Sequence, residues 1–431
     1  MKLSDRYSIT SLETGSTDQL GRLFFNDTGI TDLSNVTVVG ASVDTIRQLY
    51  YGVPSQIHID SFNEKLDRKT DFCYLCQPAD ENGVIGERYY QFHLSRMGKT
   101  ARYRFKLQNN DLGIVVLFGS YFTKLDDPGQ HLKIELSPKF ICGKTATHIQ
   151  EYLNHLASRL LQTYEPRGCS VHLACDYQGY SLPSDFLSAF TTYSRTIRTY
   201  DGLSSIDLSD ISEAVATYGG AKQERNYLIG KASAMQMALY DKSHEIIKSD
   251  KVDYFHTEWQ AYSLGQFNPT KPVRRIEARL HHHIIREIGL GMNETFESFL
   301  DISEYLTDLW RYALTRNRLN VAGSRELIHP FWQLLMQDVY FSTPAKNIDI
   351  VRKKKQAVDP VAHNFSAVIG NIISIMARQG ANAKQVLAQL KFLSFYNQII
   401  RYYNSRGLNE SDLFQHIEKG LALRGFLGKA A

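Results

Sequence analysis

Two segments decide the fold of this 431-residue chain: Tyr227–Lys242 (YLIGKASAMQMALYDK) and Val273–His283 (VRRIEARLHHH). Polar and apolar residues alternate in the second segment. Its polar positions are Arg275, Glu277, Arg279 and His281, and its apolar positions are Ile276, Ala278 and Leu280. A period of two is typical of a strand with one buried face. One carboxylate among arginines and histidines is unusual for the other face, so we expect a functional site there.

The composition indicates a protein without membrane spans. The net charge is only +4, so any binding of nucleic acid must come from local basic patches. No run approaches the roughly 20 apolar residues of a membrane span, and the N-terminus has no apolar signal segment. Five cysteines, an odd and sparse set, fit a reducing compartment. We therefore expect a cytoplasmic protein.

The N-terminal quarter begins with a polar stretch. Residues 1–35 are rich in turn signals, which predicts a loosely packed arm. Val36–Val39 is β-branched throughout and is predicted to be a short strand. Ser42–Gly52 is predicted to be an amphipathic helix because of its apolar spacing. The residues with this spacing are Val43, Ile46, Leu49 and Tyr50.

Residues 89–119 have the pattern of an antiparallel sheet. Within them, Ala101–Leu107 alternates, so one face would carry three basic residues, Arg102, Arg104 and Lys106. Such a face is either an ordinary solvated surface or a surface that contacts phosphates.

A second alternating strand, Cys169–Asp176, places His172 and Asp176 on one polar face. Four residues along an ideal strand separate their Cβ atoms by roughly 13 Å. One of them, rather than both, is expected to bind a given ion unless the strand bends or bulges.

Beyond residue 291 the pattern becomes helical, in residues 291–342 and 360–425. The basic linker between these stretches is a candidate for DNA contact through Lys353, Lys354 and Lys355. The predicted fold class is α+β, with a mainly antiparallel sheet domain followed by an all-helical domain. We place an arm at 1–35, a catalytic domain at 36–290 and a helical domain at 291–431.

Tyr240 is the candidate nucleophile. A phenol attacks phosphorus when it is positioned in line and when a hard divalent cation neutralises charge. Mg²⁺ and Mn²⁺ prefer oxygen ligands, with an occasional imidazole for Mn²⁺. Glu277 and Asp176 suit these ions, and His172 is a third candidate. Lys242 could lower the pKa of the phenol or hold the phosphate.

Each of these assignments has a structural alternative. Arg275 and Arg279 could grip phosphate bidentately, but they could equally form cross-strand salt bridges with Glu277. Tyr240 is one of 25 tyrosines. In the run His281–His283, adjacent strand residues point to opposite faces, so at most the first and third histidines converge. A rolling-circle His-x-His site would also need a bulky apolar residue between them.

Taken in order, four segments resemble the replication-initiator transesterase family. That family includes rolling-circle initiators of small plasmids, related mobilisation proteins of integrative elements, and initiators of some filamentous phages. The segments are Gly129–Ser137 (GQHLKIELS), Val171–Asp176 (VHLACD), Tyr227–Lys242 and Arg275–Leu280 (RIEARL). They are similar to the family's Glu-Leu-Ser strand, acidic strand, Tyr-Asp-Lys segment and Arg-x-Glu strand. The resemblance covers residues 36–283.

The resemblance implies that Tyr240 becomes linked to DNA and that Glu277 and Asp176 bind the metal. The family has aspartate where this chain has His172, so either His172 is the ligand or another residue, such as Glu135, replaces it. The Gly-Cys that follows the family's Glu-Leu-Ser strand is also absent; residues 138–139 are Pro-Lys here.

The function implied is a Mg²⁺- or Mn²⁺-dependent DNA nickase and ligase that starts rolling-circle replication through a 5′-phosphotyrosine. Its DNA partner would be an origin presented as a single strand or a hairpin. The C-terminal helices would bind duplex origin or a host helicase, or form a homodimer. Two alternatives remain: a conjugative relaxase with the same chemistry, and a non-catalytic origin-binding protein.

Overall fold

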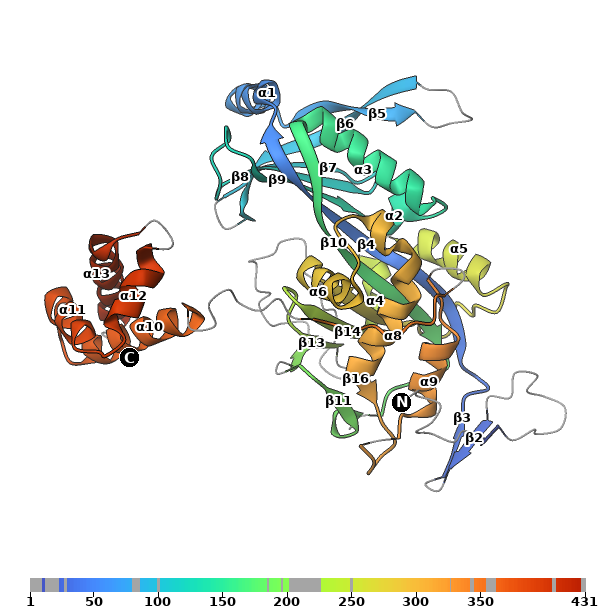
Figure 1. The fold of residues 1–431 in the computed structure, drawn as a ribbon. Coiled ribbons are helices and arrows are strands. Elements are labelled where there is room, and N and C mark those ends of the chain that lie inside the picture. Colours follow the sequence, from blue (N-terminus) through green and yellow to red (C-terminus); the bar gives the residue numbers. More distant parts are fainter. Residues whose placement is uncertain are drawn as a thin grey trace. The chain divides into compact units, whose positions relative to one another are not determined.

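The computed structural model shows two compact units, Met1–Lys353 and Lys354–Ala431 (Figure 1). The residues that it describes are 10–11, 23–26, 29–79, 86–98, 101–183, 186–194, 197–200, 226–248, 251–325, 327–341, 345–353, 362–404 and 408–427.

An 11-stranded antiparallel sheet forms the frame of the larger unit, in the order β12-β13-β14-β15-β10-β4-β9-β8-β7-β6-β5. Its strands are β4 (Thr37–Pro54), β5 (Phe72–Ala79), β6 (Gly86–Arg96), β7 (Tyr103–Asn109), β8 (Ile114–Ser120), β9 (Gly129–Leu136), β10 (Leu161–Gln178), β12 (Ile197–Tyr200), β13 (Asn226–Gly230), β14 (Met235–Asp241) and β15 (Arg274–Leu280). The 18-residue strands β4 and β10 run side by side in the middle of the sheet (Figure 1).

β4 is continuous, so the helix predicted for Ser42–Gly52 is wrong. The pairing of β4 with β10 shifts register between Val43 and Thr45, which leaves Asp44 as the extra residue of a β-bulge. The bulge resets the alternation, and Val43 and Ile46 both reach the main core although they are three residues apart. This spacing imitates that of a helix.

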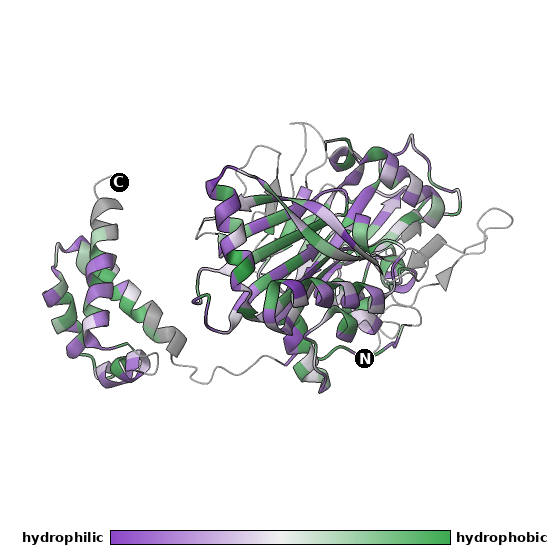
Figure 2. Ribbon diagram, turned by 90° about the horizontal axis from the view of Figure 1, so that it is seen from above, coloured by the Kyte–Doolittle hydropathy of each residue, from purple (hydrophilic) through white to green (hydrophobic). Residues whose placement is uncertain are grey.

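The main core lies between alternate sheet residues and a set of helices. The apolar positions predicted for β15 and β10 are confirmed as buried, because Ile276, Ala278, Leu280, Val171, Leu173 and Cys175 all belong to this core. The helices that contribute to it are α1 (Gln56–Asp67), α2 (Pro138–Ile141), α3 (Ala146–Leu160), α6 (His282–Met292), α7 (Phe299–Ile302), α8 (Leu306–Arg316) and α9 (Pro330–Gln337). Hydrophobic residues follow the strands through the interior of this unit in Figure 2.

Two further helices, α4 (Lys242–Lys248) and α5 (Val252–Tyr262), form a smaller apolar cluster. The cluster includes Phe255 and Trp259 from α5, which lie near the polar end of β14 and β15. Short strands complete the unit. The first 35 residues contribute β1 (Thr10–Ser11), β2 (Leu23–Asn26) and β3 (Gly29–Asp32), which form a three-stranded sheet, and β11 (Phe190–Thr192) pairs with β16 (Asn317–Leu319).

The boundary between the units falls at Lys353 rather than at the predicted residue 290. Phe299, Trp310 and Trp332 from α7, α8 and α9 are buried in the same core as the sheet. The first half of the predicted helical domain therefore belongs to the sheet unit. The smaller unit has its own core among α10 (Ala362–Arg378), α11 (Ala383–Lys391), α12 (Tyr396–Asn404) and α13 (Glu410–Leu427).

The fold class is α+β, as predicted, with an antiparallel sheet, its covering helices and a helical C-terminal unit. Within the described part of the chain, every helix is too short or too polar to cross a membrane.

Candidate active site

The register of the sheet gathers polar side chains on the face opposite the main core. Tyr240 on β14 lies opposite Arg275 on β15. Two residues along, Glu277 lies between Ala238 on β14 and Ala174 on β10. Because alanine has a short side chain, larger polar side chains from the next positions along these strands can reach Glu277.

Glu277 is 2% exposed, and its carboxylate contacts three other polar side chains of the site. The Tyr240 hydroxyl donates a hydrogen bond to its Oε2 at 3.2 Å. Arg279 donates through Nε at 2.9 Å and through Nη2 at 3.2 Å. Nδ1 of His172 lies 3.0 Å from Oε1. The candidate nucleophile and two candidate metal ligands therefore meet in one cluster.

Arg275 is 1% exposed, and its guanidinium joins two carboxylates. Nε and Nη2 donate to Asp176 at 2.6 and 2.7 Å, and Nη1 donates to Asp44. The indole Nε1 of Trp259 also donates to Asp176, at 2.8 Å. Arg275 was expected to grip a phosphate, but the structure places it as a buried clamp between carboxylates.

A candidate cation site lies beside this clamp. Asp44, His172 and Glu277 each offer one ligand atom, and these atoms lie within 4.8 Å of one another. The structure thus brings His172 and Glu277 together, as their predicted role requires. Asp176 lies outside this group and is engaged by Arg275, and Asp44 from the β4 bulge supplies the second carboxylate.

The charge states of these three groups suit a hard divalent cation. Burial alone would raise the pKa of Glu277, but Arg279 and the hydrogen bond from His172 hold it well below its usual value. Burial likewise opposes ionisation of Asp44, but the charge of Arg275 keeps its pKa below the ordinary value. Burial lowers the pKa of His172 to about 4. At neutral pH the site offers two carboxylates and one neutral imidazole.

Tyr240 is half-buried at the edge of this cluster. Burial and the charge of Glu277 raise the pKa of its phenol well above the ordinary value, so the phenol keeps its proton at neutral pH. Lys242 follows the end of β14 and begins α4. Its ammonium pairs with Glu245 and lies 4.2 Å from the ring centre of Phe255, but 6.0 Å from that of Tyr240.

Basic side chains extend the same face across the sheet. Lys106 on β7 and Lys133 on β9 lie in register through β8. Arg47 on β4 lies opposite Glu135, which binds Lys133 at 2.8 Å and Arg47 at 3.5 Å. Arg47, Lys133 and Lys106 therefore form a basic row on the face that carries Tyr240. Glu135, the alternative ligand that the family resemblance allows, is part of this row and lies outside the cation cluster.

The remaining candidates for DNA contact lie in different places. Arg104 is on β7 beside Lys106 and is half-buried. Arg102 precedes that strand in the left-handed region, with φ of 66°, so it does not continue the row. Arg279 is buried against Glu277. Lys353 ends the larger unit, and the two lysines after it lie outside the described residues.

Two residues of the site escaped the sequence analysis. Asp44 was assigned to a helix, and the β-branched residues Val43 and Thr45 beside it were the available signal for a strand. Trp259 on α5 belongs to no motif, and only the tertiary fold places it on Asp176.

No protein-family model matches this chain. The chain is similar to an uncharacterized protein, ORF430, of Pseudomonas phage Pf1, with 28% identity over 406 residues. The similarity covers 90% of this chain and 89% of the phage protein, a share too large for the sheet unit alone.

Proposed function

We propose that this protein cuts and rejoins one DNA strand with Tyr240 as nucleophile, in a cation-dependent transesterification that starts rolling-circle replication. The observation that carries the proposal is the contact of the Tyr240 hydroxyl with Glu277, inside a cluster of ligands suited to a hard cation. The similarity to a phage protein is compatible with a role on a small replicating element.

The chemistry would proceed by a single exchange of phosphodiester bonds. The phenol oxygen of Tyr240 bonds to phosphorus, and the bond from phosphorus to the 3′ oxygen breaks. The phenol loses its proton and the departing 3′ oxygen gains one, so the exchange releases no net proton. The free 3′ hydroxyl primes synthesis. The reverse exchange rejoins the strand without ATP, because the phosphotyrosine bond conserves the energy.

Asp44, His172 and Glu277 would hold the cation, and the oxygen-rich donor set fits Mg²⁺ or Mn²⁺. When bound, such an ion neutralises charge on the scissile phosphate and favours ionisation of a nearby phenol. Arg275 keeps Asp44 ionised and in place through its bridge to Asp176. Arg275 is therefore assigned as a positioning residue.

The basic row offers a route for the DNA backbone toward Tyr240. Arg47 on β4 and Lys133 on β9 occupy neighbouring strands, which lie roughly 5 Å apart, and Lys106 on β7 lies on the same face two strands beyond Lys133. Basic side chains of this kind bind the DNA backbone whatever its base sequence. Other residues of the protein must therefore recognise the bases that define the cleavage site.

The proposal is tested with supercoiled DNA that carries the replication origin. The full chain with Mg²⁺ or Mn²⁺ should convert this DNA to open circles and leave protein joined to the 5′ end of the cut strand. Addition of EDTA should stop the conversion and should leave binding of uncut DNA unchanged. Nicking that persists in EDTA would refute the cation requirement, and origin binding without nicking under all these conditions would favour the non-catalytic alternative.

The identity of the second carboxylate is tested by Asp44→Asn against Asp176→Asn. Asp44→Asn should weaken Mn²⁺ binding by more than about tenfold, because it removes a charged ligand. Asp176→Asn should weaken it less, because Asp176 acts only through Arg275. Titration followed by the electron paramagnetic resonance of free Mn²⁺ measures both. The opposite ranking would return Asp176 to the ligand set.

A further inference from the structure

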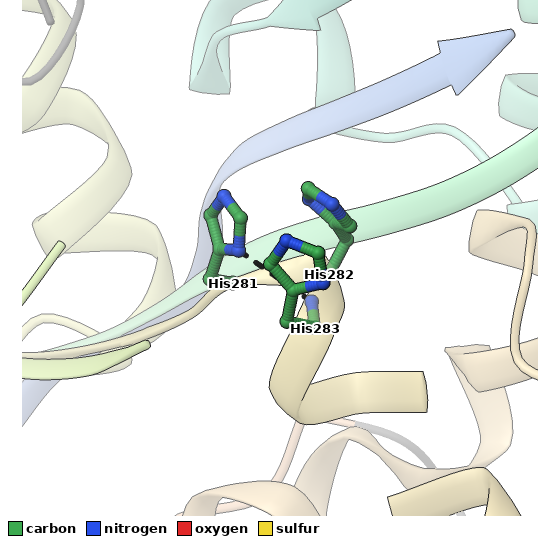
Figure 3. Close-up of side chains that lie close together, drawn as sticks. All are labelled: His281, His282 and His283. Atoms are coloured by element: carbon green, nitrogen blue, oxygen red, sulfur yellow. Dashed lines mark hydrogen bonds between the residues drawn. The ribbon is translucent and has the colours of Figure 1, made fainter. Parts of the chain in front are cut away.

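Three consecutive histidines, His281, His282 and His283, gather at the start of α6 (Figure 3). Their ring centres lie 4.0, 4.1 and 5.1 Å apart. One ring nitrogen from each lies within 4.8 Å of the others. The expectation that at most two of them converge is wrong, because β15 ends at Leu280 and the chain turns into a helix. Alternation applies only within a strand.

The backbone fixes this cluster in place. The N–H of His281 donates to the carbonyl of Ala234 at 2.9 Å, and the N–H of His282 donates to the Ser170 hydroxyl at 2.9 Å. Gly168 leaves room for one ring, because a methyl group there would lie 3.1 Å from Cβ of His282. The three imidazoles are therefore held together by anchors from two other strands or their loops, and little ordering would be needed to bind a ligand.

The rings are accessible from the surface of the unit. His281 and His282 are half-buried. His283 is exposed, so the cluster opens to solvent. Nδ1 of His281 accepts a long contact of 3.5 Å from the N–H of His283, and exchanging this weak contact for a bond to a cation would cost little.

We infer that His281, His282 and His283 bind one divalent transition-metal ion of the Zn²⁺ class, at a site separate from the Asp44–His172–Glu277 cluster. Three imidazoles are a donor set that suits zinc, copper or nickel rather than magnesium. His281 lies four residues beyond Glu277, roughly 13 Å along an ideal strand, so the two sites cannot share an ion. Three protein ligands leave a fourth position open to solvent.

The fourth position can take an anion. Lys133, Arg47, Arg102 and Arg286 lie near the rings, as does Glu287. Glu135 pairs with Lys133 and Arg47, and Glu297 pairs with Arg286. A divalent ion held by three neutral imidazoles keeps its full charge, so hydroxide or a phosphate oxygen is favoured as its fourth ligand. The basic row ends beside this cluster, so a DNA phosphate is a ligand of the right chemistry.

The inference is tested by adding Co²⁺ alone to the full, untagged chain and following its visible absorption, with competition by Zn²⁺. A Glu277→Gln background removes binding at the carboxylate cluster. We expect one tightly bound ion in that background, with absorption typical of nitrogen ligands. His282→Ala and His283→Ala should each weaken the binding by more than about tenfold, whereas His93→Ala, at an exposed histidine on β6, should not.

His283→Ala is the safer variant, because its side chain is exposed and its loss should not disturb folding. Unchanged Co²⁺ binding in both histidine variants, or no binding in the Glu277→Gln background, would overturn the inference. Neither result bears on cleavage by Tyr240, which is measured separately.

Discussion

Replacing Tyr240 with phenylalanine should abolish nicking of origin DNA and the covalent joining of protein to DNA. The substitution removes the phenol oxygen that contacts Glu277 and leaves the ring and the strand register intact. Loss of a nucleophile that acts with its partners as a unit costs on the order of 10⁴-fold or more in rate. The nicking assay and mass spectrometry of a trapped, labelled oligonucleotide measure the two losses.

Tyr227→Phe is the matched control. Tyr227 lies opposite Leu239 on the neighbouring strand, so its side chain is on the core face rather than the polar face. It should nick as well as the wild type. Equal nicking by Tyr240→Phe would refute the assignment of the nucleophile. Recovery of the oligonucleotide on a different tyrosine would keep the class of reaction and move the residue.

The side chains that share one face of a strand could be predicted from the sequence. Polar and apolar residues alternate strictly in β15 and in the second half of β10. Because the alternation has a period of two residues, it predicts which side chains lie on the same face. Glu277 and His172 were found in this way. The contact between them depends on the register of β15 against β10, which the hydrophobic pattern of one strand does not specify.

The β-bulge explains why Asp44 was missed as a candidate ligand. A bulge adds one residue to one strand, which converts a strand pattern into three- and four-residue spacing. Asp44 is that added residue, and its place in the cation cluster depends on it. In a single sequence the spacing that results is that of a helix, and the β-branched residues Val43 and Thr45 are the signal that favours a strand.

The domain boundary was missed for a different reason. The sequence pattern predicted the helices α8 and α9. An amphipathic pattern shows that a helix has a buried face, but not which other element packs against that face. Trp310 and Trp332 are fully buried against the sheet unit. The convergence of the three histidines was missed because the sequence does not show where the strand ends. The chain changes from strand to helix at His281–His282, and this change brings neighbouring side chains to one side.

Arg275→Met should destabilise the sheet unit more than the removal of an exposed arginine. The change keeps much of the side-chain volume but leaves Asp176, which is 3% exposed, without its guanidinium. Asp44 loses the same partner. Breaking a buried ion pair by removing one member costs about 3–5 kcal/mol, because the remaining charge is buried without compensation. Unfolding in urea, followed by tryptophan fluorescence, measures the free energy.

Arg96→Met is the comparison. Arg96 pairs with Asp67 at 3.0 Å, but both side chains are more than half exposed, so its loss should cost at most about 1 kcal/mol. Adding Asp176→Asn to Arg275→Met should recover part of the loss, because it removes one uncompensated charge. If Arg275→Met and Arg96→Met cost the same, the guanidinium is not what stabilises the buried carboxylates. The site would then have to tolerate their charges by other means, and the assignment of Arg275 as the residue that positions Asp44 would fail with it.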